Sequence, residues 1–120
     1  GAPLDVDRLD AKDIRRGMPR FAPANYAANL GLLPAYLAVA RELACTPAQL
    51  ALAWLLQQGP HIIPIPGTTS PGHLLDDLGA DRVVLNAATL AQLNGLINQQ
   101  TVQGARYGAQ AAGEVDTESF

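Results

Sequence analysis

The chain contains 120 residues, of which 48% are hydrophobic and 16% are charged, so it fits one small domain or a piece of a larger one. Its formal net charge of −3 excludes a basic surface for nucleic acid or anionic membranes, and no stretch reaches the ~18 apolar residues of a membrane span. The single cysteine cannot form an internal disulfide or complete a zinc site, and it points to a reducing cytoplasm.

The first third of the chain predicts an irregular leader followed by helix. Residues 1–24 carry repeated Gly and Pro and predict a surface loop, with one helical turn near 10–16. Three arginines of this loop are expected to be solvated rather than to hold a ligand: Arg15, Arg16 and Arg20. Residues 25–43 predict helix, which Pro34 either kinks or divides in two. Its expected buried stripe follows three- and four-residue spacing: Tyr26, Leu30, Leu33, Leu37, Ala40 and Leu43.

A further helix is predicted over residues 46–58 by clear start and stop signals. Thr46 suits the N-cap, Pro47 the first helical position, and Gln49 completes a capping box. The helix is expected to end at Gln58-Gly59-Pro60, with the glycine in the left-handed cap. Because the segment is apolar most of the way round, we expect it to be buried on more than one face.

The most informative stretch is HIIPIPGTTSPGHLLDD, residues 61–77. His61–Pro66 is a continuous apolar run, typical of a strand in a parallel sheet that is covered on both faces. After Gly67 breaks the run, Ser70 and Pro71 supply an N-cap and a first helical residue. A strand that leads into a capped helix makes an anion site, because free N–H groups and the helix dipole face the same point. One strand cannot be buried alone, so it belongs to a larger sheet or pairs with another chain.

The last third predicts a connector, one helix and a tail. In the connector at 81–85, Val83 and Val84 give at most a short extended piece. Asn86 is expected to cap a helix whose apolar residues are Leu90, Leu93, Leu96 and Ile97. Residues 101–120 predict a loop and tail, flexible over 108–120. The order of elements is typical of an α/β fold, and we expect 1–120 to be a single partial domain, mostly helical with one clear strand.

Side chains that could carry chemistry are sparse. The acidic residues show no metal-ligand spacing, so no metal site is expected. Cys45 lacks a paired His or a second Cys and is expected to be a small buried hydrophobe rather than a nucleophile. Ser119 has no His nearby in sequence, which leaves a hydrolase triad unsupported. Tyr26 and Tyr36 are expected to be core or rim aromatics.

Several motifs, taken in order, resemble the C-terminal third of aldo-keto reductases. The motifs are MPRF (18–21), TPAQLALA with Trp54 (46–54), IIPIPGT (62–68), HLLDD with Gly79-Ala80 (73–80) and VQGARY (102–107). The bacterial branch with an IPGT strand is the most similar. The resemblance implies an eight-stranded parallel (β/α)8 TIM barrel, of which His61–Pro66 would be the last strand. It also implies an oxidoreductase that reduces aldehydes or ketones with NADPH.

The resemblance further implies a binding site for the adenosine phosphate of the cofactor. Its expected residues come at the end of the strand and after it: Pro66, Gly67, Thr68, Thr69, Ser70, His73, Asp76 and Asp77. Many family members carry Lys or Arg where this chain has Gly67, Thr69 or Ser70, and an Arg where it has His73. Asp76 and Asp77 replace a Glu-Asn pair, so a 2′-phosphate would meet few cations. The resemblance implies NADPH as the cofactor, and the scarcity of cations makes NADH the alternative.

Two hypotheses describe the function of the chain. In the family, the catalytic Asp, Tyr, Lys and His lie on earlier strands, and no residue here matches them, so no catalytic residue is expected. The chain is then the C-terminal segment of a reductase whose partners are the nicotinamide dinucleotide, the carbonyl substrate and the missing barrel segment. Alternatively, it is a non-catalytic, mostly helical binding or assembly module that self-associates. The reductase hypothesis predicts extended neighbours for Ile62–Ile65, which it does not expect to lie bare.

Overall fold

The computed structural model describes residues 4–108 and 113, which divide into two compact units. One unit comprises Gly1–Leu32 and Ile97–Phe120, and the other Leu33–Leu96. Secondary structure in the described residues is helical throughout, with no β-strand among them. No helix in these residues has the length and apolarity needed to cross a membrane. Apart from Gly108 and Gly113, the predicted flexible tail at 108–120 lies outside the described residues.

The first unit begins with short helical turns and one helix. These are η1 (Val6–Arg8), η2 (Ile14–Gly17), η3 (Pro19–Phe21) and α1 (Pro23–Leu30). The predicted turn near 10–16 is confirmed as η2. Arg16 is exposed but not merely solvated, because its guanidinium donates hydrogen bonds to the carbonyls of Asp7 at 2.8 Å and Leu9 at 2.7 Å. Arg16 is thus exposed to solvent, as predicted, and its hydrogen bonds also hold the leader in its conformation.

Two further arginines of this unit also have partners. Arg15 forms an ion pair with Asp13 at 2.6 Å, and hydrogen bonds from its side chain and backbone lower the pKa of the Asp13 carboxyl to about 2. Arg20 donates from Nε to the carbonyl of Gly104 at 3.1 Å, which joins the leader to the segment after the last helix. Both contacts are structural rather than ligand contacts.

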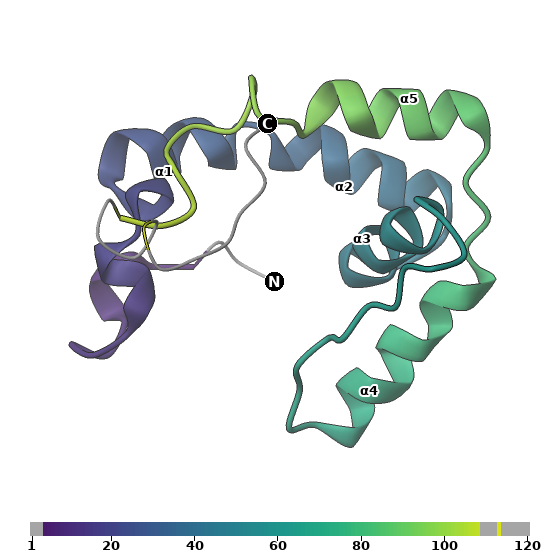
Figure 1. Ribbon diagram of the computed structural model, residues 1–120, viewed down its shortest axis with the longest axis horizontal. Helices are drawn as coiled ribbons and strands as arrows, with labels where there is room; N and C mark the ends of the chain where they lie inside the picture. The colour runs from purple at the N-terminus through teal and green to yellow at the C-terminus, as the bar shows by residue number, and fades with distance from the viewer. Residues whose placement is uncertain (1–3, 109–112, 114–120) are drawn as a thin grey trace. The chain divides into compact units, whose positions relative to one another are not determined.

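The second unit contains the remaining helices. They are α2 (Leu33–Glu42), α3 (Pro47–Leu56), α4 (Pro71–Leu78), η4 (Gly79–Arg82) and α5 (Ala87–Leu96). α2 contacts α3 and α5, and α3 contacts α4 and η4. Figure 1 shows α5 running alongside α2, with α3 seen end-on beside them. The core of this unit consists of Val39, Ala40, Leu50, Ala53, Leu85 and Leu93.

Local capping explains why the predicted helix starts are confirmed. Thr46 Oγ1 accepts from the Gln49 N–H at 3.2 Å and Gln49 Oε1 accepts from the Thr46 N–H at 3.0 Å, which completes the capping box. Ser70 accepts from the His73 N–H at 3.3 Å. Asn86 accepts from the Thr89 N–H at 2.8 Å. Each cap lies within three residues of its partner, so sequence patterns identify it.

Helix ends and buried faces differ more from the predictions. The helix expected over 25–43 is divided at Gly31-Leu32, and Pro34 lies in the first turn of α2. α3 ends at Leu56, and its C-cap is Gln57 in a right-handed conformation rather than a left-handed Gly59, whose φ is 155°. On α2 the packed residues are Tyr36, Val39 and Ala40, and Leu43 packs directly after it, whereas Leu33 and Leu37 are exposed. The predicted stripe was wrong by part of a turn, because α3 and α5 select the face that contacts them.

The predicted strand at His61–Pro66 is also wrong for the described residues. The segment runs as open coil between α3 and α4 (Figure 1), and no described residue pairs with it as a strand. Ile63 is 82% exposed and Ile65 91% exposed, whereas Ile62 and Pro64 are half-buried. Val83 and Val84 form no strand either. A strand forms only when neighbouring chain satisfies its N–H and C=O groups, and this part of the chain supplies no such neighbour.

Candidate functional site

A groove of about 630 Å³ lies between the start of α3 and the segment that leads into α4. It gathers most of the residues that the sequence assigned to a cofactor site: Pro66, Gly67, Thr68, His73, Asp76 and Asp77. Thr69 and Ser70 do not line it. The opposite wall, which sequence reasoning missed, comes from α3 and its cap: Thr46, Pro47, Ala48, Ala51 and Leu52. The structure thus adds an apolar wall to a predicted polar loop.

The loop that borders the groove and the start of α4 carry several hydrogen-bond donors. Thr68 Oγ1 accepts from the Ser70 N–H at 3.1 Å, and Ser70 Oγ caps α4. A hydroxyl that accepts a bond can still donate its own proton, so both remain donors. Within the described residues no hydrogen bond uses the N–H of Gly67 or Gly72. The loop before α4 therefore has the free donors that an anion at a helix N-terminus requires.

Gly67 leaves space at the edge of the groove. A Cβ built on this residue meets nothing within 4 Å, and its φ lies outside the positive range that favours glycine. The sequence predicts a turn at Gly67, but the chain forms no turn at this residue. The backbone does not need a glycine here, and the absence of a side chain keeps the groove open beside the free N–H groups.

The two aspartates of the site have different surroundings. Asp76 accepts from Thr46 Oγ1 and from Gln49 Nε2, both at 3.0 Å, so its carboxylate is bound to α3. Within the described part of the chain, no ion pair or side-chain hydrogen bond holds Asp77 or His73. No Lys or Arg lines the groove, so it presents no permanently cationic side chain.

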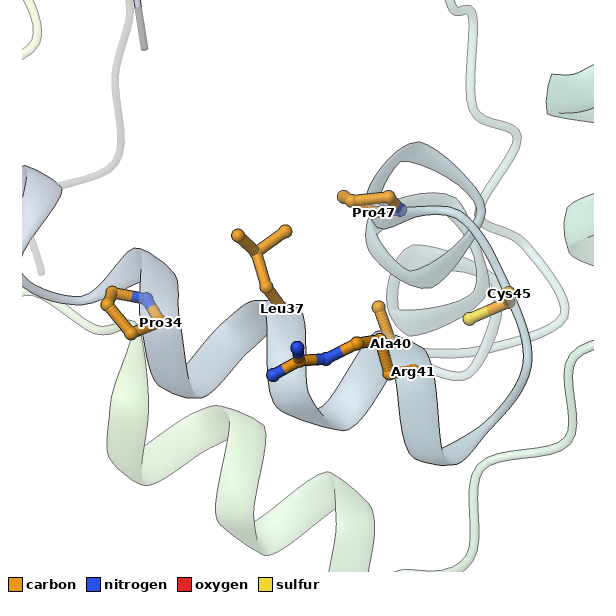
Figure 2. Close-up of a pocket in the computed structure, with 6 residues that line it drawn as sticks. All are labelled: Pro34, Leu37, Ala40, Arg41, Cys45 and Pro47. Carbon is orange, nitrogen blue, oxygen red and sulfur yellow. The ribbon is translucent and has the colours of Figure 1, made fainter. Parts of the chain in front are cut away.

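A second cavity, of about 510 Å³, lies between α2 and the start of α3 (Figure 2). Its lining residues are Pro34, Leu37, Ala40, Arg41, Cys45 and Pro47. In Figure 2 the guanidinium of Arg41 extends toward Leu37 and away from the Cys45 sulfur. The cavity therefore offers no base for the thiol. Nor do the described residues contain a group of three His, Cys, Asp or Glu that could hold a metal ion.

Both reactive groups near this cavity are made less reactive by burial. Burial raises the pKa of the Cys45 thiol, and Cys45 packs against the core of the unit. Burial also raises the pKa of Tyr36 to about 12, and the Tyr36 hydroxyl donates to the carbonyl of Pro47 at 2.8 Å. Tyr36 is thus an aromatic at the rim of the core, as predicted. Cys45 packs against the core as expected of a small hydrophobe, but it is half-buried rather than buried as predicted.

Cys45 should react slowly with iodoacetamide in the folded chain. Because its pKa is raised, the thiolate fraction at mildly alkaline pH is smaller than in an unfolded peptide, and the alkylation rate should still be rising at pH values where that of an ordinary thiol has levelled off. Mass spectrometry against time, with the urea-unfolded chain as control, measures the difference. A native rate equal to or above the unfolded rate would contradict the burial of this thiol.

Comparison with known proteins points to one family. The model of the Aldo/keto reductase family matches residues 4–98. The protein named aldo-keto reductase yakc (NADP(+)), from Schizosaccharomyces pombe, is 39% identical over 107 residues, which cover 89% of this chain and 32% of that protein. The chain therefore spans about a third of the length of this relative.

Proposed function

Because the chain belongs to the aldo/keto reductase family, we propose that it forms the part of an NAD(P)H-dependent reductase that binds the adenosine phosphate of the cofactor. The whole protein would be an oxidoreductase that reduces an aldehyde or ketone. The observation that supports this most directly is the groove, which brings the loop after Pro66 together with His73 and Asp77. No residue of this chain is assigned a part in hydride or proton transfer.

The donors of the groove fit a nucleotide phosphate. Its oxygens would accept from the Gly67 N–H and the Thr68 hydroxyl, which belong to residues of the groove. The Gly72 N–H and the Ser70 hydroxyl, at the positive end of α4 beside the groove, would add further donors. The apolar wall from α3, with Ala51 and Leu52, would exclude water on the other side. When bound, the nicotinamide dinucleotide would supply the hydride, and the role of this chain is to hold its adenosine end.

Two observations point in opposite directions on the choice between NADPH and NADH. The name of the yeast relative includes NADP(+), which favours NADPH. The Asp77 carboxylate has no cation beside it in the groove, and a carboxylate suits a ribose 2′-OH better than a 2′-phosphate. We propose NADPH as the cofactor, with NADH as the alternative that a direct comparison of adenosine 2′,5′-bisphosphate with ADP would establish.

The barrel fold that the family implies would explain why Ile63 and Ile65 are exposed in this chain. We propose that the chain is the C-terminal portion of a (β/α)8 barrel and that residues 61–66 become a strand between neighbours that this chain does not supply. Ile62 and Pro64 are half-buried while Ile63 and Ile65 are exposed, which fits a strand whose second face the rest of the barrel would cover. From the sequence alone, bare isoleucines here would count against a reductase. The expectation that exposed isoleucines would exclude a reductase was wrong. Family membership rests on the match over residues 4–98, and the chain spans about a third of its relative.

A nucleotide titration followed by NMR tests the proposed site. Adenosine 2′,5′-bisphosphate should shift the amide signals of residues 67–73 more than those of the first unit. Gly67→Val should bind roughly tenfold more weakly without unfolding, since the side chain fits but covers the N–H donors. Gly17→Val is the matched control, because Gly17 also has open space and lies in the other unit. No shifts in the unchanged chain, or equal effects of both variants, would contradict the proposal.

The purified chain alone should show no turnover of a test aldehyde with excess NADPH. The reason is that the family's proton donor and its partners have no counterpart among these residues. Loss of NADPH absorbance against an enzyme-free blank measures this. Turnover that tracks the concentration of the chain through purification would refute the assignment of this chain to cofactor binding alone.

Self-association is the second candidate function, and exposed apolar residues favour it. Ile63, Ile65, Leu75 and Val84 are large side chains open to solvent in the second unit. A second copy of the chain could cover them by pairing the segments at 61–66. Light scattering after size exclusion would show a stable, cooperative oligomer without nucleotide if the chain is an assembly module. A monomer that binds hydrophobic dyes would instead support an orphaned part of a barrel.

A further inference from the structure

Asp76, a residue of the proposed groove, has a hydrogen bond on each of its two carboxylate oxygens. Its Oδ2 accepts from Thr46 Oγ1 at 3.0 Å, and its Oδ1 accepts from Gln49 Nε2 at 3.0 Å. Gln49 Nε2 also donates to the main-chain carbonyl of Asp76 at 2.8 Å. One turn of α4 is therefore tied to the first turn of α3 by three hydrogen bonds between residues far apart in the sequence.

The same three bonds use the side-chain donors of Thr46 and Gln49 that the capping box leaves free. Gln49 Oε1 accepts from the Thr46 N–H, so its amide nitrogen remains free to donate two protons, and both go to Asp76. Thr46 Oγ1 accepts from the Gln49 N–H and donates to Asp76. A Glu at position 49 would complete a capping box equally well but would have no proton to donate. The choice of Gln over Glu is thus explained by Asp76 rather than by the helix start.

Gly79 supplies independent support for this arrangement. A Cβ on Gly79 would collide with the side-chain amide of Gln49, so the end of α4 closes onto that amide. Ala80, the next residue, is buried. The contact fixes the rotation of α4 about its axis, and His73 and Asp77, which line the groove, lie within one turn of Asp76.

We infer that Thr46 and Gln49 are positioning residues, which hold Asp76 on α3 so that His73 and Asp77 face the nucleotide while Asp76 does not contact it. This inference rests on the proposed function and goes beyond it by dividing the two aspartates into different roles. The sequence assigns both aspartates to the cofactor site, and this inference gives them different parts in it.

An exchange of amide and carboxylate between positions 49 and 76 tests the inference. Gln49→Glu keeps the capping box but places a carboxylate against Asp76, and it should weaken binding of adenosine 2′,5′-bisphosphate about tenfold. Gln49→Glu combined with Asp76→Asn restores the side-chain bond with donor and acceptor reversed, but not the bond to the main-chain carbonyl of residue 76, so it should recover part of the affinity. Asp77→Asn alone should change the affinity for adenosine 2′,5′-bisphosphate, because Asp77 is the aspartate that faces the nucleotide. Gln92→Glu, on the exposed face of α5, adds the same charge away from the groove and should have no effect.

The outcomes separate this inference from the proposed function. If the unchanged chain binds no nucleotide, the proposed site and its positioning residues fail together. If the unchanged chain binds but the folded double variant does not, the Asp76 charge itself contacts the nucleotide and the inference alone is overturned. The double variant decides this even if Gln49→Glu alone does not fold. Recovery of affinity in the double variant is a result that contact between Asp76 and the nucleotide would not produce.

Discussion

Replacing Leu50 with alanine should lower the free energy of unfolding of the chain by about 3 kcal/mol, the largest loss that we expect from a single core substitution. Leu50 is 0% exposed and lies on α3, the helix that contacts α2, α4 and η4. Removing its side chain leaves a cavity at the centre of the second unit, because helices that pack on several sides cannot all move inward.

Leu56→Ala is the matched control on the same helix. Leu56 is 39% exposed, so the same change should cost less than about 1 kcal/mol. Urea unfolding followed by the fluorescence of Trp54, which packs against the core, measures both variants. Equal losses for the two leucines would show that the core of this unit is not where the structure places it.

The second large effect is expected from Gly104→Ala in the first unit. Gly104 has a φ of +83°, and a Cβ there would lie 2.8 Å from the Pro19 carbonyl oxygen and 2.7 Å from Asn25 Nδ2. Both the backbone conformation and the contact with another part of the backbone oppose a side chain. We expect a loss of about 2 kcal/mol, together with weakening of the bond from Arg20 to the Gly104 carbonyl.

Hydrogen exchange and a second glycine make this prediction specific. The N–H of Gln103 donates to Asn29 Oδ1 at 2.7 Å, so its exchange rate reports on the joint between the leader and the segment after α5. Gly104→Ala should speed this exchange. Gly95→Ala, inside α5 with open space at its Cβ, should instead raise stability by about 1 kcal/mol. A neutral Gly104→Ala would contradict the close approach of Pro19.

Local sequence explained the helix starts but not the faces that the helices bury. The caps at Thr46, Ser70 and Asn86 were predictable because cap and partner are close in the chain. The packed face of α2 was not, since Val39 is selected by α3 and α5. An apolar period shows that a helix has a buried side, whereas the neighbours decide which residues occupy it.

The candidate site divides in the same way. The resemblance to a family predicted a site from the loop Pro66 to Ser70 and the residues His73, Asp76 and Asp77. It did not reveal the wall from α3 or the bonds of Asp76, because Thr46 and Gln49 lie 30 and 27 residues away from it. A motif describes the residues that come directly after a strand, but it contains no information about which distant helix start will compete for the same carboxylate.

The sequence by itself determined the family, the helix starts and the lack of an internal disulfide, because each depends on residue identity or on neighbours within a few positions. Only the tertiary structure decided that Ile63 and Ile65 lie bare, that Asp76 binds α3, and that Leu50 is the centre of the core. The physical reason is that strand pairing, burial and long-range hydrogen bonds all need a partner surface. No segment of the chain can supply its own partner surface.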